Sequence, residues 1–183
     1  MMGGHPNRAV FLDRDGTLAP DVNYCRRPED FNLFSDVPHA VKTLNDTGLK
    51  VIVITNQSGI ARGFFTGETL DMIHQNMLDE LKKNGAYIDA IYYCPHHPDD
   101  KCECRKPGTA LFQKAAHDLD IDLAQSFVVG DRAIDIQAGQ AIGSKTVLVS
   151  TGPTKGFIAA LTPDYVAENL LDAADWIKKV VHE

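Results

Sequence analysis

Two aspartates follow directly on a short apolar run near the start of the chain, and this stretch constrains the fold more than any other. Residues 10–17 read VFLDRDGT, so Val10 to Leu12 are apolar without alternation and Asp13 and Asp15 come next. An unbroken apolar run is typical of a strand that is buried on both faces. In open α/β sheets, ligands bind just beyond the carboxyl ends of such strands. The pattern therefore predicts a parallel strand with both carboxylates where a substrate can reach them.

Asp13 and Asp15 are separated by one residue, and two carboxylates this close are compatible only if a cation or a shared proton intervenes. Metal binding is the first explanation of such a pair. Asp-Gly is also a common turn pair, so an acidic turn of no further significance explains the motif equally well when it is taken alone. The rest of the chain decides between the two interpretations.

The composition predicts one globular domain over residues 1–183. The chain has the length of an ordinary domain, and 44% of its residues are apolar. Its net charge is -7, from 25 acidic and 18 basic residues, which argues against nucleic acid and anionic membranes as partners. No apolar run approaches the roughly 20 residues that span a bilayer, and the first residues have no signal-like apolar region. We therefore expect a cytoplasmic protein with reduced cysteines.

Apolar runs alternate with segments of helical periodicity along the whole chain, which predicts a mainly parallel sheet with helices on both faces. Ser35 or Asp36 can cap the first helix, and Thr66 the second. A Gly/Pro turn follows residue 149. The predicted strands are residues 10–12, 50–54, 88–92, 126–129, 146–149 and 165–167, and the predicted helices are about 37–47, 66–84, 109–119, 134–141 and 170–181.

Polar residues that suit phosphoryl transfer stand after several of the predicted strands. Asp13 could attack phosphorus as a nucleophile, while Asp15 could protonate the leaving alcohol and later deprotonate water. Thr55 and Lys106 could stabilise the phosphoryl oxygens. Mg²⁺ suits carboxylate oxygens and bridges to phosphate, and its predicted ligands are Asp13, Asp15 and Asp131. Asp135 follows in the first turn of a helix, where we expect it to cap the helix or to support the metal site from outside.

Four motifs occur in the order DRDGT, TNQSG, RKP and GDRAID, and this ordered set resembles the haloacid dehalogenase (HAD) superfamily of aspartate-nucleophile phosphatases. The resemblance extends from Val10 to about Pro153. It implies a Rossmann-like sheet, Mg²⁺, Asp13 as the nucleophile, Asp15 as the acid/base and Asp131 as a metal ligand. The intervals in which other members insert cap domains are short here, so we expect no large cap domain.

A second metal site is predicted from Cys94, His96, Cys102 and Cys104. A Cys-x-His and a Cys-x-Cys pair provide three thiolates and one imidazole, the ligand set of a closed structural Zn²⁺ site. His97 could replace His96, and the alternative without metal is two reduced cysteine pairs in a surface loop. A bound Zn²⁺ would brace the loop that presents Arg105 and Lys106.

This zinc loop followed by CRKP resembles the branch of the superfamily that contains heptose-bisphosphate and histidinol-phosphate phosphatases. The run TNQSGIARGFF and the first loop resemble the heptose enzymes, whereas the short PDDKCEC segment resembles the histidinol-phosphatase side. Both substrates, and both anomers of a heptose, stay open at this point. The predicted substrate-binding residues are Asp21, Val22, Asn23, Tyr24, Asn56, Gln57, Ser58, Arg105 and Arg132.

The sequence argues against two other function classes. A kinase of the P-loop type would need a GxxxxGK[ST] loop, which this sequence lacks. A non-enzymatic phospho-accepting receiver also places an aspartate and Mg²⁺ at a strand end, but it has no second acidic residue two positions on and no zinc loop. Three histidines, His39, His74 and His117, fall within predicted helices, where packed or solvated histidines outnumber catalytic ones.

Overall fold

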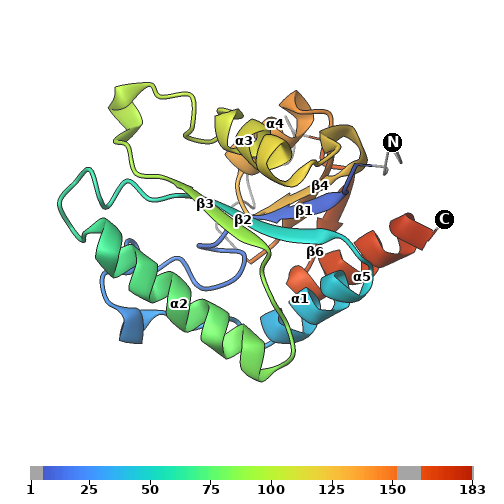
Figure 1. Cartoon of the computed structure of the whole chain (residues 1–183), viewed down its shortest axis with the longest axis horizontal. Helices are drawn as coiled ribbons and strands as arrows, with labels where there is room; N and C mark the ends of the chain where they lie inside the picture. The colour runs from blue at the N-terminus through green and yellow to red at the C-terminus, as the bar shows by residue number, and fades with distance from the viewer. Residues whose placement is uncertain (1–5, 152–161, 183) are drawn as a thin grey trace.

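A six-stranded, entirely parallel sheet forms the centre of the molecule, in the order β3-β2-β1-β4-β5-β6 (Figure 1). The computed structural model describes residues 6–151 and 162–182. The predicted α/β fold with a mainly parallel sheet is confirmed. The strands are β1 (Ala9–Leu12), β2 (Lys50–Asn56), β3 (Ala90–Cys94), β4 (Phe127–Gly130), β5 (Lys145–Val149) and β6 (Tyr165–Ala167).

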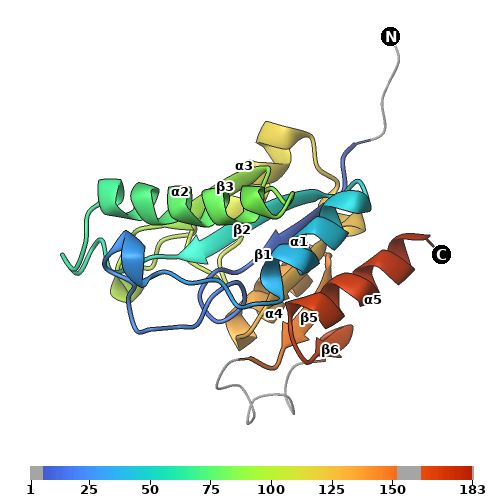
Figure 2. The same ribbon diagram turned by 90° about the horizontal axis from the view of Figure 1, so that it is seen from below.

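Helices cover both faces of this sheet. One face carries α1 (Val37–Asp46), α2 (Gly67–Lys83) and α5 (Leu170–His182), and Figure 2 shows α1 and α5 lying side by side. The other face carries α3 (Ala110–Leu119) and α4 (Ala133–Ala141) (Figure 1). Short 3-10 turns occur at Pro28–Asp30, Pro98–Asp100 and Leu123–Gln125.

Alternate residues of β1 point to the two faces, which explains why its sequence is apolar throughout. Val10 and Leu12 belong to the core beneath α1, α2 and α5, whereas Ala9 and Phe11 belong to the core beneath α3 and α4. Phe11 meets Phe112 of α3 edge to face, with ring centroids 5.2 Å apart. The strand that carries Asp13 at its end is thereby anchored on both sides.

The strand β3 begins two residues later than predicted, and it also ends two residues later. Asp89 stands just before the strand, where its amide donates a hydrogen bond to the Val51 carbonyl (2.7 Å) and its carboxylate accepts hydrogen bonds from the Val51 amide (2.8 Å) and the Lys50 ammonium (3.0 Å). The pairing instead runs from Ala90 to Cys94, where Cys94 lies opposite Asn56. This register brings the first cysteine of the predicted zinc site to the end of the sheet.

The predicted caps differ in outcome. Thr66 caps α2 through a hydrogen bond from the Thr69 amide to its hydroxyl (3.2 Å), as expected. Asp36 does precede α1, but its side chain does not cap the helix. Its carboxylate accepts a hydrogen bond from the Leu171 amide (3.3 Å) instead, so it joins α1 to α5.

The chain places three neighbouring strand ends, those of β2, β1 and β4, along one edge of the sheet. The chain leaves β1 through α1 to β2 on one side, and it returns from β3 through α3 to β4 on the other side of β1. Such a switch point leaves a crevice beyond the carboxyl ends. As predicted, no large cap domain interrupts the fold between β1 and α3, where only loops, two 3-10 turns, α1, α2 and two strands occur. A single domain over the full length stays a prediction, and the Gly/Pro turn after residue 149 falls largely outside the described residues.

Within residues 6–151 and 162–182, no helix combines the length and the apolar character that crossing a membrane requires.

Candidate active site

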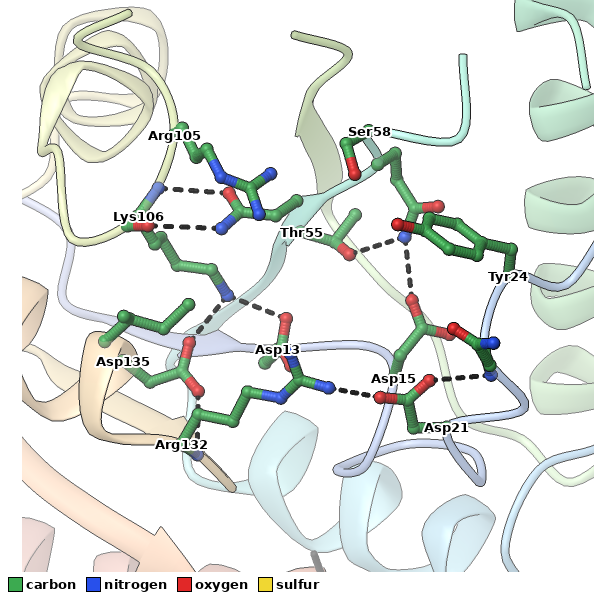
Figure 3. Close-up of a pocket in the computed structure, with 14 residues that line it drawn as sticks. Asp13, Asp15, Asp21, Tyr24, Thr55, Ser58, Arg105, Lys106, Arg132 and Asp135 are labelled. Carbon is green, nitrogen blue, oxygen red and sulfur yellow. Dashed lines mark hydrogen bonds and ion pairs between the residues drawn. The ribbon is translucent and has the colours of Figure 1, made fainter. Parts of the chain in front are cut away.

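A cavity of about 160 Å³ lies beyond the carboxyl ends of β1 and β2 and is closed by the segments after β3 and β4 (Figure 3). The predicted residues Asp13, Asp15, Thr55 and Lys106 all line it. Most of the predicted substrate-binding residues line it as well. The complete lining is Asp13, Asp15, Asp21, Asn23, Tyr24, Thr55, Asn56, Gln57, Ser58, Arg105, Lys106, Arg132, Ile134 and Asp135.

The Lys106 ammonium lies at the bottom of this cavity and makes three short contacts. It is 2.7 Å from Asp13 Oδ1 and 2.8 Å from Asp135 Oδ1, and it donates a hydrogen bond to the Ile54 carbonyl (2.7 Å) (Figure 3). Burial lowers the pKa of a lysine, but the carboxylates of Asp13 and Asp135 more than offset this effect and raise the pKa of Lys106. Lys106 is therefore a fixed positive charge beside the predicted nucleophile.

Asn56 determines where Lys106 lies. Its side-chain oxygen accepts a hydrogen bond from the Lys106 amide (3.0 Å), and its amide group donates to the Lys106 carbonyl (3.2 Å). This reciprocal pair ties the end of β2 to the loop that carries the lysine. Asn56, predicted to bind substrate, thus also supports the backbone of a neighbouring site residue.

Asp13, Asp131 and Asp135 bring one carboxylate oxygen each to within 4.8 Å of one another. Burial, with a contribution from Asp135, raises the pKa of Asp131 to about 6, and burial raises that of Asp13 to about 7 against the opposing effect of Lys106. A hard divalent cation prefers such carboxylate oxygens, and its charge would favour their ionised forms. The donor set therefore fits Mg²⁺.

The membership of this carboxylate group differs from the predicted ligand set, because Asp135 belongs to it and the Asp15 side chain does not. Asp135 also caps α4, since its Oδ2 accepts a hydrogen bond from the Arg132 amide (3.1 Å), as predicted. Gly16, with φ +91°, turns the chain back beside Asp131, where a Cβ atom would lie 2.2 Å from Asp131 Oδ2. The turn that follows Asp15 therefore requires glycine, and the Asp15 carboxylate is bound by Arg14 and Gln57 instead.

Asp15 is held by hydrogen bonds from two directions. The Arg14 guanidinium donates to both carboxylate oxygens, at 3.0 and 3.2 Å to Oδ1 and 2.8 Å to Oδ2. The Gln57 amide donates to Oδ2 from the other side (2.8 Å) and also to the Thr55 hydroxyl (2.9 Å). Figure 3 shows the Asp13 and Asp15 carboxylates facing the same cavity.

Cys94, His96, Cys102 and Cys104 meet beside the cavity, as their spacing predicts. Their ligand atoms lie within 4.8 Å of one another, and the three sulfur atoms are 3.1 to 3.4 Å apart. His96 Nδ1 is 3.1 Å from Cys104 Sγ, whereas His97 Nδ1 accepts a hydrogen bond from the Asp99 amide. His96 is therefore the imidazole of the group, and three thiols with one imidazole fit a tetrahedral metal site.

Comparisons with known proteins agree with this geometry. A family model described as HAD-hydrolase-like matches residues 103–173. The D-glycero-beta-D-manno-heptose-1,7-bisphosphate 7-phosphatase of Haemophilus ducreyi is 42% identical over 178 residues, which cover 93% of this chain and 98% of that protein. The enzyme of the same name from Yersinia pestis is 40% identical over 179 residues, with 93% and 95% coverage.

A solved structure of D,D-heptose 1,7-bisphosphate phosphatase from B. bronchiseptica, complexed with magnesium and phosphate, superposes with a TM-score of 0.89. It is 35% identical in sequence, and the match covers 94% of this chain and 99% of that one. The chain belongs to the HAD-like phosphatases. It is therefore a phosphoric monoester hydrolase. The resemblance to the HAD superfamily and the predicted enzyme class are both confirmed.

Arg14 and Ile134 lie at the site of this phosphatase, and the sequence motifs predict no role for either. Arg14 lies between the two aspartates and is only 1% exposed. Its Nη1 donates to Nε2 of His74 (3.2 Å), a residue of α2 that is 6% exposed. The sequence predicts a packed or solvated histidine at this position, and it is packed. Ile134 lines the cavity itself. The position of Arg14 between Asp13 and Asp15 is the sequence feature that indicates a contact with a carboxylate.

The rim of the cavity is more exposed. Arg132 forms an ion pair with Asp21 across the mouth (Figure 3). Tyr24 meets Phe64 edge to face, with ring centroids 4.9 Å apart. Val22, which was predicted to bind substrate, does not line the cavity, and half of its surface is exposed. Its neighbours Asp21 and Asn23 do line the cavity, and the role of Val22 in binding stays a prediction.

We expect the Cys/His group to hold about one equivalent of Zn²⁺ and the Cys104→Ser variant to lose it, because a thiolate ligand is replaced by a poorer donor. Elemental analysis of the purified proteins would measure this. Cys25→Ser is the matched control, since Cys25 lies apart from the group, and it should retain the metal. Equal metal content in both variants would contradict the site.

We also expect His74 to make the protein sensitive to acid. Burial, together with the nearby Arg14, lowers the pKa of His74 to about 3. At mildly acidic pH the unfolded chain therefore binds more protons at His74 than the folded one. The free energy of unfolding is unaffected by His74 above pH 6.5, and it decreases as the pH falls from 6.5 toward 3. Between pH 7 and 5 the wild type should lose about 2 kcal/mol more unfolding free energy than His74→Gln.

Urea titrations at the two pH values would test this, with His39→Gln as the control because His39 is exposed. The comparison removes acid effects at the Cys/His group, which all three proteins share. Parallel pH dependence of the wild type and His74→Gln would contradict the expectation.

Proposed function

We propose that the chain hydrolyses a sugar phosphate through an aspartyl-phosphate on Asp13, and that it removes the 7-phosphate of D-glycero-D-manno-heptose 1,7-bisphosphate. The observation that carries the chemistry is the buried contact of Asp13 with Lys106 at the bottom of the cavity. The names of relatives that match nearly the whole chain support the substrate. Histidinol phosphate is the second candidate, because the segment between His97 and Cys102 is short.

In the first half-reaction, a carboxylate oxygen of Asp13 attacks phosphorus and the bond from phosphorus to the ester oxygen breaks. Asp15 gives its proton to that oxygen, so the alcohol leaves neutral. In the second half-reaction, Asp15 takes a proton from water, whose oxygen attacks phosphorus. The acyl phosphate bond breaks, and Asp13 and inorganic phosphate are released.

Charge on the transferring group is balanced by fixed donors and cations. Lys106 is a permanent ammonium beside Asp13, and the Thr55 hydroxyl lines the same cavity. We propose Asp13, Asp131 and Asp135 as the residues that would hold Mg²⁺, whose charge, when it is bound, neutralises phosphoryl oxygens. The magnesium in the B. bronchiseptica structure supports this cofactor.

The rest of the substrate would contact the cavity walls. Arg105 and Arg132 are suited to hydroxyl groups or to a second phosphate, because a guanidinium can donate two parallel hydrogen bonds. Asn23, Tyr24 and Ser58 line the wall nearer the mouth. We propose that Zn²⁺ on the Cys/His group has a structural role, since Cys104 directly precedes Arg105.

Asp13→Asn should lower kcat by at least about a thousandfold, because an amide is a poor nucleophile toward phosphorus. Steady-state phosphate release would measure this. Asp46→Asn, the same change at an exposed position of α1, should retain full activity. Unchanged circular dichroism and zinc content in Asp13→Asn would exclude misfolding, and an active Asp13→Asn enzyme would refute the aspartyl-phosphate mechanism.

We expect kcat/KM to be more than about a hundredfold higher for the heptose bisphosphate than for histidinol phosphate, a difference of about 2.7 kcal/mol in transition-state binding. Both anomers of the heptose should be assayed on zinc-replete protein in Mg²⁺. A preference for histidinol phosphate would overturn the substrate assignment and leave the chemistry intact.

A further inference from the structure

We propose that Arg14 and His74 form a positioning pair that holds the acid/base Asp15 in the orientation from which it protonates the leaving group. Neither residue lines the cavity, so each acts through Asp15. The inference rests on the role proposed above for Asp15. It adds two positioning residues to those that take part in the reaction, and one of them, His74, lies on α2.

Arg14 is a buried guanidinium, and each of its three nitrogen atoms makes a directed contact. Its Nε and Nη2 donate hydrogen bonds to the two oxygens of Asp15, and its Nη1 donates to His74 Nε2. The Phe31 ring lies beneath it, with the guanidinium carbon 5.5 Å from the ring centroid. A planar fork held at three edges and on one face has little freedom to rotate, so it fixes the plane of the carboxylate that it binds.

His74 can accept this hydrogen bond because its imidazole is neutral. The low pKa that burial and Arg14 impose keeps the ring neutral, and one ring nitrogen is then an acceptor. The bond from Arg14 identifies that nitrogen as Nε2. A protonated ring would have only donors to offer and would repel the guanidinium.

The helix α2 provides a rigid base for this imidazole. Leu70, Ile73 and Met77 surround position 74 on the inner face of the helix, and all three are fully buried. The contacts therefore run in series from the core of α2 through His74 and Arg14 to Asp15. Gln57, which is bound to Thr55, fixes the carboxylate from the cavity side.

A positioning role differs from a merely structural ion pair in its dependence on the leaving group. The alcohol of an alkyl phosphate leaves as a strongly basic alkoxide unless its oxygen is protonated. Hydrolysis of such an ester therefore depends on a well-placed acid. The anion of p-nitrophenol is a weak base and needs little protonation. The parameter kcat/KM reports the steps up to the departure of the alcohol, so it isolates this half-reaction from the later attack of water.

The test compares His74→Phe, which keeps an aromatic ring but has no acceptor, with His74→Gln, which restores one. We expect His74→Phe to lower kcat/KM for the heptose bisphosphate roughly tenfold more than kcat/KM for p-nitrophenyl phosphate. His74→Gln should recover most of the difference. If the Phe variant does not fold, His74→Leu takes its place, since it too lacks an acceptor.

Equal losses on the two substrates, or no recovery in His74→Gln, would overturn the positioning pair. Asp15→Asn, assayed in parallel, separates this failure from that of the proposed function. If Asp15→Asn discriminates between the leaving groups and His74→Phe does not, only the pair is overturned. If Asp15→Asn does not discriminate either, the acid role of Asp15 falls, and the pair falls with it.

Discussion

The contact of the buried Lys106 ammonium with Asp13 and Asp135 is the interaction on which the rest of the site depends. A charge removed from water is tolerated only where opposite charges and hydrogen bonds replace its hydration. Lys106 obtains these from the end of β1, the first turn of α4 and the Ile54 carbonyl of β2. One side chain thus joins three neighbouring elements at the switch point of the sheet. Its position in turn has to be maintained by the loop after β3, which has little regular structure of its own.

That loop is held at both ends by interactions that the sheet provides. Cys94 closes β3, while Cys102 and Cys104 stand just before Arg105 and Lys106, so a metal on the Cys/His group would anchor the loop a few residues from the buried lysine. Asn56 anchors it again through the backbone of Lys106. At Gly108 the chain folds so closely that a Cβ atom would lie 2.2 Å from the Glu103 carbonyl. The loop is therefore a rigid support for its cation.

The sequence predicted the strand-end residues well because parallel strands end along one edge of a sheet, whatever their exact bounds. It could not say which carboxylates meet, since that depends on the turns after each strand. Asp135 returns toward the end of β1 because a tight helical turn follows β4, whereas the Asp15 carboxylate is bound by Arg14 and Gln57. The later start of β3 had the same kind of cause. Asp89 binds both backbone groups of Val51, one through its own amide and one through its carboxylate, and only the packed structure shows where the strand begins.

The partner of Arg14 was beyond the reach of sequence patterns for a related reason. His74 is 60 residues away and lies among apolar residues of α2, a setting typical of a core histidine. Arg14 and His74 nevertheless explain how Asp13 and Asp15 coexist. Lys106 binds the first carboxylate and Arg14 binds the second, so each has a cation of its own. Because the two cations approach from different elements, they hold the aspartates in different surroundings, and this separation is what distinct roles for two adjacent carboxylates require.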